Sequence, residues 1–194
     1  LNNDELYILF QTSGKGTRAI SGLNPGDRVT VWGPLGNGYS IQEQVPTLLL
    51  AGGIGLAPFI GLVRKHKHPE NLELLFGHKQ DAANFPFAEI SKLILAWNHQ
   101  DKSLEQLQVF IRAVEVKIDA YASDGLILAC GPRPFLKKVQ EISAELGART
   151  QISLENNMAC GVGACLGCVS QSVNGHYLCT CTQGPVFRAD EVVL

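Results

Sequence analysis

Five of the six cysteines in this sequence lie close together near its end. Three of them, Cys160, Cys165 and Cys168, have the spacing C-x4-C-x2-C, and Cys179 and Cys181 follow. This spacing, completed by a more distant cysteine, is typical of the plant-type [2Fe–2S] cluster, whose irons are held by four thiolates. In a chain of cytoplasmic type, such a group favours a metal or redox centre over a disulfide framework. The pattern therefore predicts an iron–sulfur centre.

Glycines separate these cysteines, at Gly161, Gly163 and Gly167. A loop that gathers four thiolates around a compact anionic cluster needs unusual backbone angles and inward-pointing N–H groups, which glycine permits. Two alternatives stay open, a structural zinc site and cysteines that bind no metal, although structural zinc sites usually pair two C-x2–4-C knuckles. The spacing alone also leaves Cys179 and Cys181 open as the fourth ligand.

Two glycine-rich turns each follow an expected strand. They are residues 52–58 (Gly-Gly-Ile-Gly-Leu-Ala-Pro) and residues 130–132 (Cys-Gly-Pro). A strand, a glycine turn and the start of a helix form the geometry that binds a pyrophosphate. The alternative is that both are only tight structural turns. Residues 14–17 (Gly-Lys-Gly-Thr) offer the same choice between a diphosphate site and a turn.

Other reactive side chains have plainer interpretations. Cys130 ends an apolar run, where a small buried side chain is as good an explanation as a functional thiol. No spacing suggests a Ser–His–Asp or Cys–His arrangement, so no catalytic residue is expected. The five histidines stand in polar stretches and are interpreted as surface residues: His66, His68, His78, His99 and His176.

The elements that must position these motifs alternate between residues 45 and 154. Short apolar strands alternating with helices predict a parallel sheet covered on both faces. Residues 107–111 fit either a strand or a helix. Strands are expected at 47–51, 72–76, 126–130 and 150–154, and helices up to residue 65, at 87–97 and at 132–146.

The two ends of the chain differ from this middle part. Strands are expected at 6–11 and 28–32, but so few strands cannot form an independent sheet, so residues 1–44 either pack elsewhere or are part of a barrel. The last forty residues predict short strands at 168–171, 177–179 and 191–194. The expected domains are therefore residues 1–44, 45–154 and 155–194.

Composition excludes several classes of function. Among 194 residues, 18 acidic side chains face 16 basic ones, a net charge of −2, so no basic surface for nucleic acid is expected. Hydrophobic residues make up 45% of the chain, which excludes intrinsic disorder. No uncharged run reaches the length of a membrane span, and residues 1–5 predict no signal sequence, so the expected location is cytoplasmic.

In this order, the motifs resemble those of the electron-transfer subunits of dihydroorotate dehydrogenase B, a family within the ferredoxin reductase-like superfamily. The resemblance covers essentially the whole chain. Its most specific parts are residues 155–168 and residues 181–187 (Cys-Thr-Gln-Gly-Pro-Val-Phe), because the family's fourth cluster ligand stands just before Gly-Pro-Val-Phe. It also rests on residues 14–17, 33–38, 52–58 and 130–132.

The resemblance implies an α/β fold with a partial antiparallel β-barrel for FAD at residues 1–44, an NAD-binding parallel-sheet domain and a C-terminal [2Fe–2S] segment. It implies Cys160, Cys165, Cys168 and Cys181 as the cluster ligands. FAD contacts would lie at Leu9, Phe10, Gln11, Gly16 and Thr17, and nicotinamide-nucleotide contacts at Gly53, Gly55 and Gly131.

The implied function is electron transfer in pyrimidine (UMP) biosynthesis. Electrons from dihydroorotate oxidation in a partner FMN subunit pass through the cluster and FAD to NAD⁺, in a heterotetramer. One alternative is a reductase subunit that uses NAD(P)H for sulfur or ferredoxin chemistry. Another is an inactive binding module, since the family's Arg-x-Tyr/Phe-Ser flavin motif is not found before Leu6.

The cluster loop itself predicts a partner surface. Residues 161–167 carry no charge, and an exposed apolar loop beside a redox centre suits an interface. The alternative is that these small residues only wrap the cluster. The candidate contacts with the partner subunit are Val162, Ala164 and Leu166.

Overall fold

The computed structural model describes residues 5–194. The absence of a signal sequence was expected from residues 1–5, of which residues 1–4 lie outside the described part, as does the start of the expected first domain. The chain divides into two compact units, residues up to Pro34 and residues Leu35–Leu194. The boundaries expected at residues 44 and 154 stay predictions.

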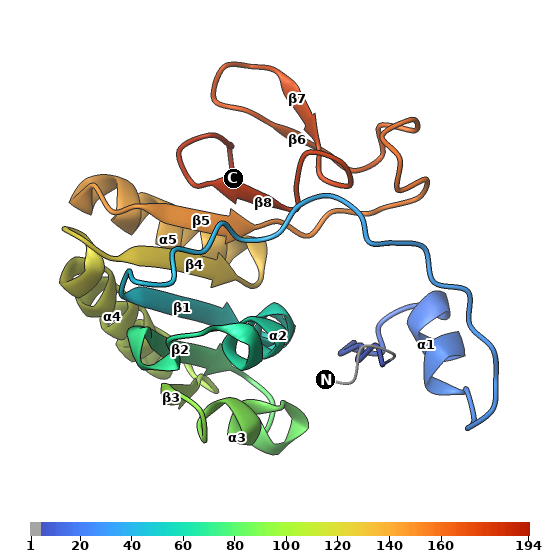
Figure 1. Cartoon of the computed structure of the whole chain (residues 1–194), viewed down its shortest axis with the longest axis horizontal. Helices are drawn as coiled ribbons and strands as arrows, with labels where there is room; N and C mark the ends of the chain where they lie inside the picture. Colours follow the sequence, from blue (N-terminus) through green and yellow to red (C-terminus); the bar gives the residue numbers. More distant parts are fainter. Residues whose placement is uncertain (1–4) are drawn as a thin grey trace. The chain divides into compact units, whose positions relative to one another are not determined.

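The second unit is built on a six-stranded sheet in the order β3-β2-β1-β4-β5-β8 (Figure 1). The first five of these strands run parallel, and β8 pairs antiparallel with β5. The prediction of a parallel sheet is confirmed. The strand bounds are β1 Thr47–Gly52, β2 Leu72–His78, β3 Leu95–Gln100, β4 Leu126–Cys130, β5 Thr150–Ser153 and β8 Val186–Arg188.

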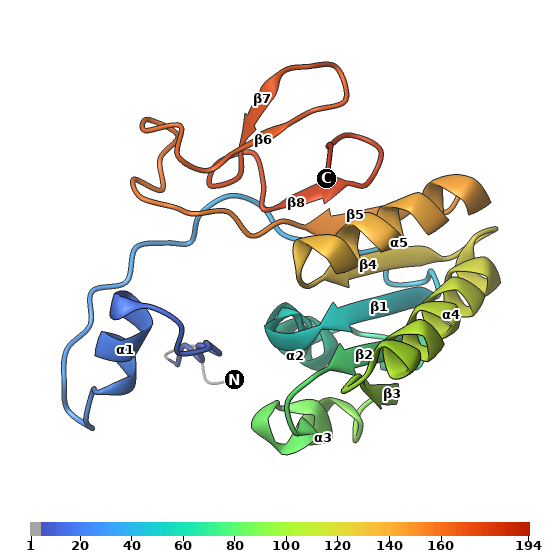
Figure 2. The same cartoon turned by 180° about the vertical axis from the view of Figure 1, so that it is seen from behind.

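Helices cover both faces of this sheet, which explains why its central strands are continuously apolar. Figure 1 shows α2 (Ala57–Lys65) and the short α3 (Phe87–Ile90) on one face. Figure 2 shows α4 (Leu104–Tyr121) and α5 (Arg133–Leu146) on the other. Every residue of β1 is buried. Short 3-10 turns occupy Gly53–Leu56, Pro69–Asn71 and Ala82–Asn84.

Local signals set the limits of the longer helices. The Ser103 side chain caps α4 by accepting a hydrogen bond from the backbone N–H of Gln106, 3.2 Å away. Helix α5 begins after Pro132 and ends at Gly147, whose φ of 66° is the left-handed conformation that glycine adopts most easily. The expected helix at 132–146 is thus confirmed, and residues 107–111 belong to α4.

One helix prediction was mostly wrong. Residues 87–97 were expected to be helical, but the helix stops at Ile90 and a strand, β3, starts at Leu95. This strand pairs with β2 at the edge of the sheet, and its burial is low and irregular. An edge strand buries little of either face, so its sequence carries neither the alternation nor the apolar run that marks a strand.

The segment that carries the cysteines is mostly irregular. Its β6 (Val169–Gln171) and β7 (Tyr177–Cys179) form a two-stranded hairpin, as expected from the sequence. The strand expected at 191–194 was wrong, because only a single bridge joins Ser172 to Val192. The segment is attached to the main sheet through β8 instead.

The described residues of the first unit, 5–34, contain one helix, α1 (Lys15–Ser21), and no strand. The strands expected at 6–11 and 28–32 were therefore wrong, and residues 14–17 start a helix. A strand needs a neighbour for its backbone and a covered face for its apolar side chains. Here these side chains are exposed: Leu6, Tyr7, Ile8, Val29, Val31 and Trp32.

Two histidines were also misinterpreted as surface residues. His66 and His78 are 8% and 3% exposed. The His78 ring stacks on Phe76 and its Nδ1 lies 2.6 Å from the Gln80 carbonyl oxygen, so the ring is part of the core. Among the described residues, no helix is long and apolar enough to cross a membrane.

Candidate iron–sulfur and nucleotide sites

Left-handed backbone turns shape residues 158–168, which hold the first three of the five clustered cysteines and are called the cysteine loop below. Gly161 and Gly163 have φ angles of 71° and 77°, and Leu166 has 54°. A left-handed leucine costs about 1–2 kcal/mol relative to an ordinary conformation. In return, the turn points the N–H of Gly167 at Cys165 Sγ, 3.4 Å away. The loop thus stores strain in order to aim backbone N–H groups at sulfur.

Cys160 and Cys165 form one pair of thiols. The N–H of Cys165 lies 3.4 Å from Cys160 Sγ. The pKa of Cys160 is lowered to about 6 because the N–H groups of Val162 and Cys165 donate to its sulfur, with smaller help from Ala164. At neutral pH this thiol is largely ionised, and the thiolate is the form that binds iron.

Cys168 and Cys181 form the second pair, and each is only 2% exposed. The pKa of Cys168 is lowered because the backbone N–H and then the thiol of Cys181 donate to its sulfur. The pKa of Cys181 is raised because its own thiol is that donor, although the N–H of Gly163 also points at it. The negative charge of Cys160 also raises the pKa of Cys181, which indicates that the two pairs of thiols lie near one another.

Cys179 lies differently. It ends β7, where its backbone N–H donates to Gln183 Oε1 at 2.9 Å. Its carbonyl oxygen accepts from the N–H groups of Thr182 and Gln183, which closes a tight turn around Cys181. In the described part of the chain, none of the thiol contacts reported above involves Cys179.

The arrangement in pairs bears on the choice of metal. Within residues 5–194, no three His, Cys, Asp or Glu side chains converge as a single metal ion would require. A structural zinc ion needs four ligands around one point. A [2Fe–2S] cluster makes a different demand, because its four cysteines are shared between two irons. Two neighbouring pairs of thiols, each faced by backbone N–H groups, fit this cluster better than zinc.

A contact from far along the chain holds the turn that contains Cys181. The backbone N–H of Asn37 donates to the Gly184 carbonyl oxygen at 2.6 Å. Its side chain donates to the Gln183 carbonyl oxygen at 2.9 Å and accepts from the Val186 N–H at 3.1 Å. Gly36 must be glycine here, since a Cβ would lie 1.9 Å from the Gly184 oxygen. Sequence reasoning missed Asn37, and only its place in a glycine-rich turn marked it.

The two glycine turns meet at the carboxyl edge of the sheet. The first follows β1 and the second follows β4, and these two strands are neighbours although β2 and β3 lie between them in sequence. The strand order reverses at this place, which is where open α/β sheets bind ligands. Two of the three glycines expected to contact a nucleotide, Gly55 and Gly131, are thus close together.

Close packing explains part of this glycine pattern. A Cβ on Gly55 would lie 2.2 Å from the Cys130 carbonyl oxygen, and one on Gly131 would lie 2.8 Å from Phe135. These two glycines let the turns approach one another. Gly53 differs, because its φ is 55° and no atom lies within 4 Å of its missing Cβ. Gly53 therefore faces open space, where a ligand could lie.

Burial dominates the chemistry of the neighbouring Cys130. Its pKa is raised to about 11, chiefly by burial, and Ser153 opposes this with a hydrogen bond. Nearby, the Tyr39 hydroxyl donates to the Ala129 carbonyl oxygen at 2.8 Å, and burial raises the pKa of this phenol too. Cys130 thus behaves as a small protonated side chain at the end of β4.

The residues expected to contact FAD all belong to the first unit. Residues 9–11 (Leu-Phe-Gln) are not in a strand, and Gly16 lies within α1. The Thr17 hydroxyl accepts hydrogen bonds from the N–H groups of Ser13 and Gly14, at 2.9 and 3.1 Å. These groups bond to one another, so this segment by itself offers no formed flavin cradle.

Two cavities flank the last strands. One, of about 320 Å³, lies between the Gly131 turn and the cysteine segment, and Arg133, Asn156, Ser170 and Tyr177 contribute to its wall. A larger one, of about 750 Å³, lies at the opposite ends of β4 and β5 around Arg149 and Arg188. Only the smaller cavity touches a residue of the expected nucleotide or cluster site.

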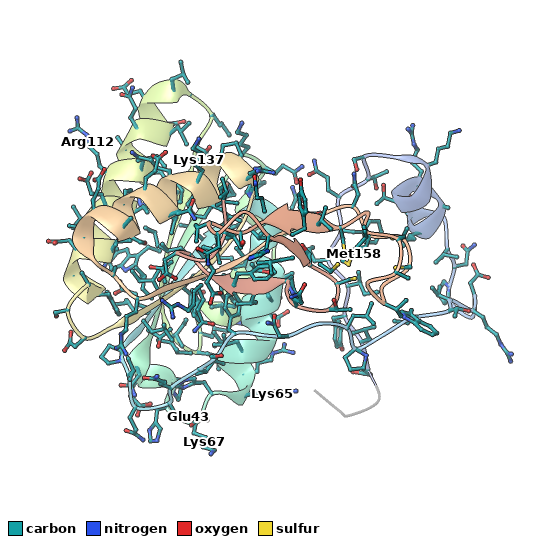
Figure 3. All side chains as sticks on the ribbon, turned by 90° about the horizontal axis from the view of Figure 1, so that it is seen from above. Glu43, Lys65, Lys67, Arg112, Lys137 and Met158 are labelled. Atoms are coloured by element: carbon teal, nitrogen blue, oxygen red, sulfur yellow. The ribbon has the colours of Figure 1, made fainter. Side chains whose placement is uncertain are left out.

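The cysteine loop is exposed and apolar. Met158, Val162 and Leu166 are 58%, 55% and 61% exposed. Figure 3 shows Met158 on this loop, well apart from Arg112 of α4 and Lys137 of α5. The charged helical face and the uncharged cysteine loop are therefore different surfaces.

Comparison with known proteins finds a family model for the cysteine segment and relatives for nearly the whole chain. Residues 155–193 match the family model described as the iron–sulfur cluster binding domain of dihydroorotate dehydrogenase B. A relative from Caldanaerobacter subterraneus subsp. tengcongensis, named dihydroorotate dehydrogenase B (NAD(+)), electron transfer subunit, is 35% identical over 98% of this chain and 76% of its own length. A relative of the same name from Geobacillus thermodenitrificans is 36% identical over 98% of this chain and 75% of its own.

The fold has a solved counterpart. A structure described as the NADH-dependent reduced ferredoxin-NADP oxidoreductase of flavin-based electron bifurcation superposes with a TM-score of 0.80. It is 25% identical, and the match covers 95% of this chain and 67% of the other. The ferredoxin reductase-like fold expected from the sequence is confirmed.

Proposed function

This chain belongs to the family of dihydroorotate dehydrogenase B electron transfer subunits, and from that membership we propose that it carries electrons from dihydroorotate oxidation to NAD⁺ in pyrimidine biosynthesis. The relatives' names supply the reaction, the acceptor and the role of a subunit. The single observation that carries the proposal is the cysteine loop, whose paired thiols and inward-pointing N–H groups suit a redox cluster. The chain is thus part of an oxidoreductase.

The proposed cluster ligands are Cys160 and Cys165 for one iron and Cys168 and Cys181 for the other. The pairing of the thiols supports this division. Cys181 is preferred to Cys179 because it is buried beside Cys168, whereas Cys179 ends a strand. When bound, an iron–sulfur cluster exchanges single electrons, while a flavin and a nicotinamide can exchange them in pairs.

The chain's own residues then have three tasks. The N–H groups of the cysteine loop stabilise negative charge on sulfur. Hydrogen bonds of this kind to metal ligands tune the properties of a metal site. The apolar side chains of the loop are exposed and available to a partner. The turns at the carboxyl edge leave open space at Gly53, and Gly55 and Gly131 allow the two turns to approach one another.

NAD and FAD are proposed as the nucleotides of this subunit. The place of the two glycine turns at the reversal of strand order supports an NAD site there. The proposal of FAD binding rests on family membership. The proposed contacts are Leu9, Phe10, Gln11, Gly16 and Thr17. Because residues 5–34 form no strand and Thr17 is bonded within its own turn, this site requires a rearrangement of the segment.

A catalytic partner subunit completes the enzyme, since the relatives are named as electron transfer subunits. We infer that this partner contains FMN, that the assembly is a heterotetramer and that it is cytoplasmic. Free cysteines at all six positions suit that reducing compartment. The exposed Val162, Ala164 and Leu166 are the proposed contacts.

The partner surface can be tested with one substitution. Leu166→Glu places a charge on the exposed loop and should weaken association with the catalytic subunit at least tenfold, while the visible spectrum of the isolated subunit is retained. Val116→Glu, on the exposed side of α4, is the matched control. Equal affinity of Leu166→Glu and wild-type protein for the catalytic subunit would show that the loop wraps the cluster without contacting the partner.

The main experiment is anaerobic purification followed by a visible and EPR spectrum with iron, sulfide and flavin analysis. A [2Fe–2S] spectrum that bleaches when the partner subunit and dihydroorotate are added, and returns with NAD⁺, is the expected result. A protein that holds zinc or no metal after anaerobic purification would refute the proposal. Orotate formation by this chain without its partner would contradict the absence of a catalytic residue.

A second function is favoured by the similarity to the ferredoxin-NADP oxidoreductase structure. In that case the electron source would be a reduced ferredoxin and no dihydroorotate dehydrogenase partner would be needed. The same protein can be tested with reduced ferredoxin in place of the partner subunit. Reduction of NAD⁺ or NADP⁺ by ferredoxin alone would favour this alternative.

A further inference from the structure

One side-chain amide joins three separate parts of the cysteine segment. The Nδ2 of Asn156 lies 3.0 Å from the Cys168 carbonyl oxygen, 2.8 Å from Ser170 Oγ and 2.8 Å from Thr180 Oγ1. Its two N–H groups are thus shared among three oxygens. Two of these oxygens belong to a proposed ligand residue, Cys168, and to the residue directly before another, Cys181.

The position of this amide matters because the hairpin ends there. The β6–β7 ladder stops at the pair Val169 and Cys179. Beyond it, one backbone hydrogen bond continues, from the Thr180 N–H to the Cys168 carbonyl oxygen at 3.1 Å. Cys168 and Cys181 therefore lie where the β6 and β7 segments begin to separate, and the Asn156 amide joins the two segments there.

Burial strengthens the effect of these bonds. Cys168 is 2% exposed and Thr180 is 1% exposed. Water has little access to residues buried this deeply, so losing one hydrogen bond here costs more than losing one at the surface. Asn156 is therefore better placed than any exposed residue of the loop to fix the distance between the two sulfurs.

We infer that Asn156 is a positioning residue for the iron held by Cys168 and Cys181, an inference that rests on the proposed cluster function. The Asn156 amide fixes the separation of this thiol pair through Cys168 and Thr180. It makes no contact of this kind with Cys160 or Cys165, whose geometry is set by the N–H groups of their own loop. The effect of Asn156 thus falls on one iron of the two.

The test compares Asn156→Leu with Asn157→Leu. Leucine has the same number of side-chain heavy atoms as asparagine and the same branching, but it is larger and donates no hydrogen bond. Asn157 is the adjacent exposed residue, and among the described residues no side-chain hydrogen bond is recorded for it. Both variants and wild-type protein are purified anaerobically, and the Mössbauer spectrum, the EPR g values and the rate of iron loss to a chelator are measured.

The expected result is a Mössbauer change confined to one iron site in Asn156→Leu, altered g values and iron loss faster by about tenfold or more, since residues that orient metal ligands have effects of this size. Asn157→Leu should match wild-type protein. Asn156→Leu spectra that match those of wild-type protein would overturn the inference.

A milder variant guards against a folding defect. Thr180→Val removes one acceptor with almost no change of shape, and it should shift the signal of the same iron by a smaller amount. Spectra identical to wild-type would refute the inference while leaving the cluster function intact. Wild-type protein without any [2Fe–2S] signal would refute both. Equal perturbation of both irons in Asn156→Leu would also count against it.

Discussion

Cys130 and Cys160 are both partly buried cysteines beside a glycine, yet their thiols have opposite properties. In the α/β part, burial raises the pKa of Cys130 to about 11. In the cysteine segment, backbone N–H groups lower the pKa of Cys160 to about 6. One region keeps its sulfur protonated and the other ionises it, although the residue type is the same.

The difference lies in what satisfies the backbone. Around Cys130, backbone N–H groups are used in the ladders that join β4 to its neighbours β1 and β5. In the cysteine segment, left-handed turns at Gly161, Gly163 and Leu166 free their neighbours' N–H groups to face sulfur. Regular secondary structure therefore forms the core, while irregular backbone positions the cysteines proposed as ligands.

The largest expected effect concerns which cysteines of the cysteine segment bind the cluster. Cys181→Ser should lose the [2Fe–2S] spectrum or strongly perturb it, because a buried thiolate paired with Cys168 is removed. Cys179→Ser should retain the spectrum. Visible and EPR spectra of anaerobically purified variants give the answer, and a bleached Cys179→Ser beside an intact Cys181→Ser would reverse the assignment.

The second prediction measures the contrast in pKa directly. In protein freed of its cluster, Cys160 should be alkylated by iodoacetamide far faster than Cys130 at pH 7, where roughly nine-tenths of a thiol of pKa about 6 is ionised. As pH rises from 5, the rate at Cys160 should level off above about 7, while that at Cys130 keeps rising toward 11.

Tandem mass spectrometry after a timed reaction distinguishes the two cysteines. The thiolate is the reactive form, so each rate follows the deprotonated fraction with increasing pH. Similar rates for Cys160 and Cys130 across this range would show that the N–H groups of the loop do not act on sulfur as the structure indicates.

A third prediction concerns glycine in the α/β part. Gly55→Ala should lower the free energy of unfolding by about 1–3 kcal/mol, the usual cost of forcing atoms into a packed site, because its Cβ would meet the Cys130 backbone. Gly38→Ala meets nothing within 4 Å and is the control. Thermal denaturation monitored by circular dichroism compares them, and equal midpoints would disprove close packing of the turns.

The smallest expected effect is the response of the α/β part to loss of the cluster. Removing iron with a chelator should leave the helical circular dichroism signal almost unchanged, because the core of α4, α5 and the sheet contains none of the proposed ligands. Phe187 and Val192, beyond the last cysteine, are buried in that core and should stay there. A large loss of helix would show that the two regions are not separable.

The same division explains what the sequence could predict. Strands such as β1 and β4 are buried on both faces, so a run of apolar residues marks them without knowledge of their neighbours. Residues 28–32 show a strand's alternation too, but a strand forms only beside a partner. The edge strand β3 fails in the opposite way, since its low burial removes the pattern.

The cysteine site was predictable in part for similar reasons. Its spacing is a local property, so Cys160, Cys165 and Cys168 could be chosen from the sequence. The choice of Cys181 came from a resemblance to a family, because spacing allows Cys179 equally. Asn37 and Asn156 act through contacts between distant segments, and such contacts leave no periodic signal in a single sequence.

The clasp between Asn37 and the turn at Gln183 joins residues 146 positions apart. During synthesis, the chain must therefore be made as far as Gln183 before the turn that holds Cys181 can find its anchor at Asn37. Closing so long a loop from an unfolded chain would cost several kcal/mol of entropy, roughly as the logarithm of its length. Because a sheet that is already folded shortens the effective loop, we expect the parallel strands to form before this contact closes.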